Sequence, residues 1–100
     1  YLNPDASASD KYAKASVKVR TATYSMWVYR DSDVVSESVL RNGQWDSKAT
    51  EKILDALELA RKFLERKLGT AVDPVFADIG TNVGWFTAAI SSQGYSTISF

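Results

Sequence analysis

The sequence predicts an α/β fold, in which a β-hairpin and a long amphipathic helix precede a parallel strand–helix–strand (βαβ) unit. Three observations predict this fold. Alternating and β-branched residues between positions 16 and 29 indicate two strands. A continuous apolar stripe between positions 47 and 68 indicates a helix. The 22 residues after Asp78 carry no charged side chain, which is typical of segments buried in a parallel sheet.

The N-terminal part is predicted to contain an extended arm and a hairpin. Residues 1–15 begin with a stretch rich in Ser, Ala, Asp and Asn, and we expect them to form the arm. Residues 16–20 alternate between valines and basic side chains, and residues 23–29 are dense in β-branched and aromatic types. We expect these two segments to pair, with the turn near Thr21–Ala22, although neither residue is typical of a hairpin turn.

A short helix follows the hairpin and completes a segment that we place at 16–46. The spacing of Val35, Val39 and Leu40 predicts a helix over residues 33–40. Asp31, Ser32 or Asp33 can supply its N-cap, and Asn42–Gly43 is a typical helix end.

The third segment, 47–100, opens with the longest predicted helix, from about Ser47 to Leu68. Asp46 or Ser47 supplies the N-cap and Gly69 the residue after the last turn. Glu58 and Lys62 have the spacing of a favourable ion pair. We expect the apolar stripe to cover one face of the helix's own domain rather than to bind a partner. The stripe consists of Ile53, Leu57, Ala60, Leu64 and Leu68, widened by Leu54 and Phe63.

The βαβ unit is predicted from a strand over 75–79, a helix over 85–92 ended by Gly94, and a second strand over Tyr95–Phe100. The turn between the first strand and the helix lies where open α/β sheets bind ligands. It contains two glycines, which allow a ligand to approach the backbone closely, and Asn82, which tolerates a left-handed conformation.

Several kinds of ligand site use such a turn. A phosphate-binding loop is excluded because no lysine follows Gly84. A dinucleotide-binding fingerprint fits poorly because Gly80 and Gly84 are four residues apart with Asn82 between them. An S-adenosylmethionine site fits better, since Asp78 supplies an acidic residue at the end of the strand. From these seven residues alone, a strand–helix turn without a ligand remains equally open.

Three segments resemble FkbM-family methyltransferases. Residues 78–86, Asp-Ile-Gly-Thr-Asn-Val-Gly-Trp-Phe, are similar to that family's first motif, Asp-(Ile/Val)-Gly-Ala-Asn-(Ile/Val)-Gly followed by an aromatic pair, with Thr81 in place of Ala. Residues 28–36 resemble its strand, acidic turn and Val-Ser helix start. Residues 41–46 resemble its Gly-x-Trp-Glu segment, with Asp46 in place of Glu. The resemblance covers residues 24–100, and the segments occur in the family's order.

The resemblance implies the first βαβ unit of a Rossmann-like, S-adenosylmethionine-dependent methyltransferase, usually one that acts on oxygen. It implies that Trp85 and Phe86 pack the helix against the sheet. Trp45 and Asp46 could approach the cofactor pocket, although capping alone accounts for Asp46. The residues that it implies on the methionine and ribose side of the cofactor are Asp78, Gly80, Thr81, Asn82 and Gly84.

Composition excludes several other classes of function. The chain has no His and no Cys, so tetrahedral zinc sites, Ser–His or Cys–His nucleophiles and disulfides are excluded, and we expect no metal. Five basic residues near the N-terminus, Lys11 to Arg30, are interpreted as a solvated strand face. Twelve basic and twelve acidic residues give a formal net charge of zero, from which we expect no nucleic acid partner. No apolar run is long enough to span a membrane.

The resemblance also implies what the chain lacks. In such folds an acidic residue at the end of the second strand binds the ribose. The sequence stops on that strand, at Phe100, without an acidic residue. We therefore expect the chain alone neither to bind S-adenosylmethionine with a useful, micromolar affinity nor to transfer a methyl group. It is expected to be the N-terminal part of an enzyme or, alternatively, a non-catalytic methyltransferase-like subunit of a larger assembly. The remainder of the enzyme or other chains would cover the Tyr95–Phe100 edge. From a start at Tyr1 instead of Met we expect either that the chain was processed, which is compatible with organellar import, or that it is a piece of a longer protein; the sequence indicates no compartment.

Overall fold

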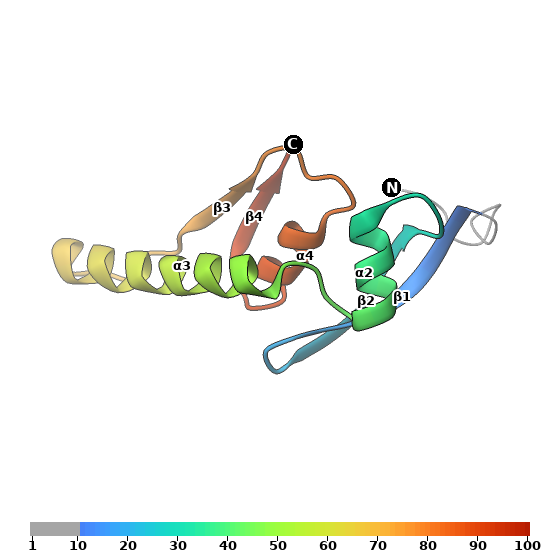
Figure 1. Ribbon diagram of the computed structural model, residues 1–100. Helices are drawn as coiled ribbons and strands as arrows, with labels where there is room; N and C mark the ends of the chain where they lie inside the picture. The colour runs from blue at the N-terminus through green and yellow to red at the C-terminus, as the bar shows by residue number, and fades with distance from the viewer. Residues whose placement is uncertain (1–10) are drawn as a thin grey trace. The chain divides into compact units, whose positions relative to one another are not determined.

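The computed structural model describes residues 11–100, which form two compact units (Figure 1). The first unit ends at Trp45 and the second spans Asp46–Phe100. The boundary thus lies one residue before the predicted one. The first ten residues of the predicted arm fall outside the described part. The fold is mixed α/β, with one antiparallel and one parallel strand pair.

The hairpin of the first unit is longer than predicted. β1 (Tyr12–Val19) pairs with β2 (Ala22–Tyr29), and the register runs from Tyr12 opposite Tyr29 to Val19 opposite Ala22. The strand therefore includes residues 12–15, which the sequence assigned to the arm. The turn consists of Arg20 and Thr21, one residue earlier than predicted, and Arg20 has a φ of 53°. Alanine and lysine have weak strand preferences, and pairing with β2 outweighs them.

One face of the hairpin forms the core of this unit against α2 (Val34–Asn42), as Figure 1 shows. The buried side chains on that face are Ala15, Val17, Val19 and Val28, and α2 contributes Ser36 and Val39. Asp33 is the N-cap of α2, because its Oδ2 accepts hydrogen bonds from Ser36 N at 2.8 Å and Ser36 Oγ at 2.6 Å. Gly43 ends the helix with a φ of 75°, which confirms the predicted end.

Tyr24 contributes a buried hydroxyl group that has no hydrogen-bond partner. Burial raises the pKa of Tyr24 to about 12 from its ordinary value of 10.0. In the unfolded chain the Tyr24 hydroxyl therefore ionises near pH 10, whereas in the folded protein it retains its proton. The free energy of unfolding therefore falls as the pH rises from 10 to 12. We expect Tyr24→Phe to raise the free energy of unfolding by about 1 kcal/mol at pH 7.

The pH dependence of this effect provides its own check. We expect the advantage of Tyr24→Phe over the natural chain to grow between pH 9 and pH 11.5, in urea denaturation followed by circular dichroism. The two proteins differ only at residue 24, so the contributions of all other groups cancel in the difference. An advantage that stays constant over this range would show that the folded protein does not retain the Tyr24 proton.

The second unit begins with α3 (Ser47–Leu68), whose bounds match the prediction. Asp46 is its N-cap, because Oδ1 accepts a hydrogen bond from Ala49 N at 3.1 Å. Leu54 is fully buried, yet Phe63 and Leu68 of the predicted stripe are 58% and 61% exposed. The expectation that the whole stripe covers its own domain is therefore wrong for the C-terminal half of the helix. The described partners of α3 are too short to reach it.

The predicted βαβ unit is present in the second unit. β3 (Val75–Asp78) and β4 (Ser96–Ser99) pair in parallel, with Val75 opposite Ser96 and Asp78 opposite Ser99. α4 (Trp85–Ser91) connects them and lies against both strands (Figure 1). Each element is one or two residues shorter than predicted. This unit brings the turn after β3 beside the carboxyl end of β4.

Tyr95 attaches the start of β4 to α3. Its side chain is 8% exposed, and its hydroxyl donates to Glu58 Oε2 at 2.9 Å. The guanidinium of Arg61 lies 4.6 Å above the Tyr95 ring and also faces Glu58. The predicted pair of Glu58 with Lys62 is present at 3.9 Å, at the outer limit of an ion pair.

Candidate functional site

The turn over residues 79–84 leads from the end of β3 into α4. Gly80, Asn82 and Gly84 have φ values of 73°, 56° and 87°, so three of its residues are left-handed. A Cβ atom added at Gly80 would meet nothing within 4 Å, and one added at Gly84 would lie 3.8 Å from Thr81 Cγ2. The backbone of the turn is therefore open to a ligand at the positions where the sequence predicted close approach.

Thr81 fixes this turn to the ends of both strands. Its N–H donates to the carbonyl oxygen of Phe100 at 3.2 Å. Its hydroxyl lies 3.0 Å from the carbonyl oxygens of both Asp78 and Phe100. Phe100 N in turn donates to the Asp78 carbonyl at 2.9 Å. The hydroxyl that distinguishes Thr81 from the alanine of the family motif therefore has a structural use, which the motif comparison did not indicate.

Asp78 is the only buried carboxylate among the described residues, with 7% of its surface exposed. Its Oδ2 accepts hydrogen bonds from Thr87 N at 3.1 Å and from Thr87 Oγ1 at 2.7 Å. The Thr87 hydroxyl also lies 2.6 Å from Ser99 Oγ. Since a hydroxyl has one proton and a carboxylate can only accept, Ser99 must donate to Thr87, which donates to Asp78.

This arrangement gives Asp78 a different role from the predicted one. The sequence suggested that its carboxylate meets a cationic or hydroxyl-bearing ligand at the strand tip. Instead, the Asp78 carboxylate accepts a hydrogen bond from the Thr87 hydroxyl of its own chain. It also caps α4, because the N-cap residue Gly84 has no side chain that could cap the helix. Thr87 and Ser99 were not among the predicted site residues. The only signal for them was the abundance of hydroxyl side chains in the uncharged C-terminal segment.

The structure thus places four of the five predicted cofactor residues in one turn and the fifth, Asp78, at the end of the strand before it. Asp78 is buried, Thr81 is half-buried and bonded to both strand ends, and Asn82 is exposed. Gly80 is exposed with open space above its backbone, whereas Gly84 is half-buried. What the turn offers a ligand is therefore backbone and the Asn82 amide, held in place by Asp78 and Thr81.

Trp85 lies outside this site. It is 2% exposed, and its Nε1 donates to Thr50 Oγ1 at 3.0 Å. Thr50 Oγ1 donates to the Asp46 carbonyl oxygen, also at 3.0 Å. Trp85 therefore packs α4 against the start of α3, whereas the sequence placed it against the sheet. Asp46 acts as a helix cap, as predicted. Trp45 belongs to the other unit and is half-buried.

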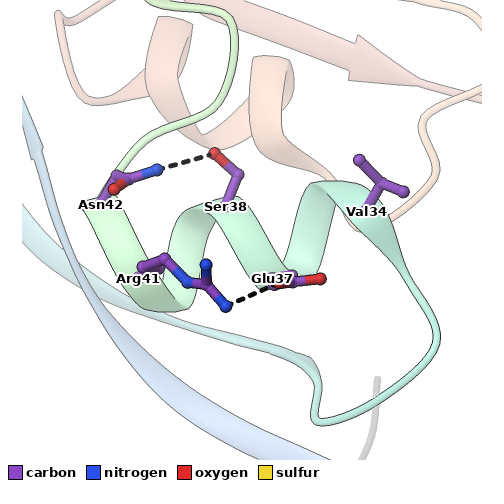
Figure 2. Close-up of a pocket in the computed structure, with 5 residues that line it drawn as sticks. All are labelled: Val34, Glu37, Ser38, Arg41 and Asn42. Carbon is purple, nitrogen blue, oxygen red and sulfur yellow. Dashed lines mark hydrogen bonds and ion pairs between the residues drawn. The ribbon is translucent and has the colours of Figure 1, made fainter.

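Two shallow cavities lie in the first unit. One, of about 260 Å³, runs along α2, as Figure 2 shows. Its charges satisfy each other, because Arg41 Nη2 lies 2.7 Å from Glu37 Oε1. The second cavity, of about 250 Å³, is lined by Lys11, Tyr12, Tyr29 and Asp31. The first cavity is therefore lined by charges that pair with each other, and the second combines aromatic rings with charge.

Among residues 11–100, no cluster of three or more acidic side chains has the geometry to hold a metal ion. None of the helices in this part of the chain is both long and apolar enough to cross a membrane. The turn after β3 and the exposed face of the hairpin are therefore the features that carry a functional argument.

The described residues define the protein as mixed α/β, with a parallel βαβ unit and a separate hairpin–helix unit. Comparisons with protein-family models, curated proteins and solved structures gave no match. Any function must therefore be argued from the residues and geometry of the chain itself.

Proposed function

We propose that Asp46–Phe100 is the cofactor-binding start of a Rossmann-like, S-adenosylmethionine-dependent methyltransferase of FkbM type, acting on oxygen. The observation that carries the proposal is the turn after β3. Three left-handed residues lie in the turn that follows a parallel strand; two of them are glycines, and Gly80 has open space above its backbone. The same residues carry the resemblance to the family's first motif.

The position of the turn supports this reading physically. Ligands of open α/β sheets bind outside the carboxyl ends of the strands. Here the carboxyl ends of β3 and β4 are tied together by the bonds of Thr81 and Phe100. A cofactor on the turn would lie over Gly80 and Gly84, with Asn82 offering an amide to its polar groups. S-adenosylmethionine supplies the electrophilic methyl group itself, so a site without His or Cys suits this chemistry.

One observation supports the second candidate, a non-catalytic methyltransferase-like subunit, as much as the first. The sheet face opposite α4 exposes apolar side chains, with Val75 at 53%, Ile98 at 51% and Phe100 at 72%. Exposed apolar side chains that gather on one face mark surfaces that other protein covers. The remainder of an enzyme or partner chains would cover this face equally well. Cofactor binding at the turn separates the two candidates.

Photolabelling tests the cofactor site directly. S-adenosylmethionine tritiated at the methyl group is used at millimolar concentration, and the chain is irradiated and digested with trypsin. Because Lys67 is the last basic residue, one peptide, 68–100, contains β3, the turn, α4 and β4. We expect the label in this peptide and expect excess S-adenosylhomocysteine to remove it.

A matched pair of glycine variants controls for strain. Gly80 and Gly69 have φ values of 73° and 70°, and an added Cβ meets nothing within 4 Å at either position. We expect Gly80→Ala and Gly69→Ala each to lower stability by about 1 kcal/mol. Only Gly80→Ala should lose most of the label, because its methyl group occupies the space proposed for the cofactor.

The photolabelling results separate the two candidate functions. Label spread over the tryptic peptides, or label that S-adenosylhomocysteine does not remove, contradicts the proposal. Equal losses of label in Gly80→Ala and Gly69→Ala would also contradict the proposal. A folded chain that takes up no label favours the non-catalytic subunit.

A further inference from the structure

We propose that the exposed face of the hairpin binds single-stranded nucleic acid. This inference concerns the first unit and is independent of the proposed methyltransferase site. We call the face the platform. It consists of Tyr12, Lys14, Ser16 and Lys18 of β1 and Thr23, Ser25, Trp27 and Tyr29 of β2.

Strand alternation separates the platform from the core of the unit. In β1 the residues at odd positions from Ala15 to Val19 are buried, whereas Lys14, Ser16 and Lys18 between them are exposed. The register places platform residues directly opposite one another, such as Lys14 opposite Trp27. α2 packs on the opposite, buried face, and the platform extends about 20 Å from Tyr12 to Lys18.

The charge of this region is strongly one-sided. Residues 11–30 contain five basic and no acidic side chains. Lys14 and Lys18 are exposed, and neither forms an ion pair within the described part of the chain. Arg30 lies at the Tyr12 end, where its Nη2 donates to the Tyr12 carbonyl at 3.1 Å. The expectation of no nucleic acid partner rested on the total charge and on the interpretation of these basic residues as a solvated strand face.

Aromatic rings stand at one end of the platform. The Tyr12 and Tyr29 ring centroids are 5.5 Å apart, and Tyr29 is 45% exposed. Beside them lies the cavity of about 250 Å³, which is also lined by Lys11 and Asp31. Bases of single strands stack on such rings, while cations follow the phosphates. Asp31 would accept a hydrogen bond from an amino or imino group of the stacked base.

Other anionic partners fit the platform less well. A membrane surface favours a face rich in Trp, Phe and Leu that inserts among the lipids, and the platform has one such side chain, Trp27, which is half-buried. An acidic peptide would pair with the lysines without using the aromatic pair or its cavity. A duplex conceals the faces of its bases, so the tyrosines could not stack on them. Single-stranded nucleic acid uses every type of residue on the platform.

Fluorescence anisotropy of a labelled 12-nucleotide oligothymidine, titrated with the full chain at several salt concentrations, tests the proposal. Phosphate contacts by Lys14, Lys18 and Arg30 predict that log K falls with log salt with a slope of about −2. We expect Lys14→Gln with Lys18→Gln to weaken binding at least tenfold and to reduce the slope to about −0.7. Tyr29→Ala should weaken binding about tenfold without changing the slope.

The control removes two lysines from another surface. Lys48 and Lys52 are exposed on α3, so Lys48→Gln with Lys52→Gln makes the same change in net charge. We expect this variant to bind as the natural chain does. Circular dichroism verifies that each variant is folded.

Several results would overturn the proposal. These are no binding at 20 mM salt, equal weakening by the control pair, and equal affinity for polyglutamate or for a duplex of the same length. Tighter binding to phosphatidylserine vesicles than to the oligonucleotide would assign the face to membranes instead.

Discussion

Trp85→Ala is expected to lower the free energy of unfolding of the second unit by about 4 kcal/mol. Trp85 is 2% exposed, so its removal leaves a cavity between α4 and the first turns of α3. The variant also removes the donor to Thr50 Oγ1 inside the core. Because the second unit has few fully buried side chains, we expect the loss to approach the whole stability of the unit.

Urea denaturation followed by circular dichroism at 222 nm measures this loss, since α3 contributes most of the helix. Trp85→Phe preserves most of the packing and should cost about 1–2 kcal/mol, through the lost hydrogen bond and the smaller ring. Phe63→Ala removes an aromatic ring from α3 that is 58% exposed, and it should change stability by less than about 0.5 kcal/mol. Equal effects of Trp85→Ala and Phe63→Ala would show that α4 does not pack on α3 as described.

Asp78→Ala has the second largest expected effect, a loss of about 2–3 kcal/mol. Two donors of Thr87, its N–H and its hydroxyl, would lose the carboxylate that accepts them. α4 would also lose its only described side-chain cap, because Gly84 provides none. A carboxylate beside the first turn of a helix is favoured by the helix dipole as well.

Three further variants test the proton order in this network. Asp78→Asn retains an oxygen that accepts from Thr87, so we expect it to lose only about 1 kcal/mol. Thr87→Val breaks the network at its centre and should cost more than Ser99→Ala, which removes only the outermost donor. Denaturation curves rank the four variants. A loss for Ser99→Ala as large as that for Asp78→Ala would contradict the order Ser99 to Thr87 to Asp78.

Much of the fold could be predicted because local signals agreed with tertiary structure. The bounds of α3 follow from Asp46, Gly69 and the apolar spacing between them. The parallel pairing of β3 and β4 follows from the apolar residues of β3, the uncharged sequence of β4 and the intervening helix. Helix caps are local interactions that depend on residues a few positions apart, and the sequence therefore indicates them well.

The errors share a different physical cause. Residues 13–15 have weak strand preferences, and only their pairing with β2 makes them a strand. The exposure of Phe63 depends on what surrounds α3, which its own periodicity does not indicate. The contact of Trp85 with Thr50 joins residues 35 positions apart in the chain. Such contacts are decided by packing in three dimensions.

The sequence predicted which residues form the candidate site more accurately than it predicted what each of them does. The left-handed conformations at Gly80, Asn82 and Gly84 follow from residue type. The burial of Asp78 by Thr87 could not be predicted, because it depends on the register of β4 and α4 over the strand end. A motif therefore identified the turn, and the structure distinguished the residues that hold it from those that face open space.

The central claim, that the turn after β3 is an S-adenosylmethionine site, is tested most directly by nuclear magnetic resonance. Amide shifts of the ¹⁵N-labelled chain are recorded while S-adenosylmethionine is added to several millimolar. We predict saturable shifts at Gly80, Asn82 and Gly84 and at the end of β4, with the platform unaffected. Shifts confined to other residues, or none at the turn at saturating cofactor, would contradict the account.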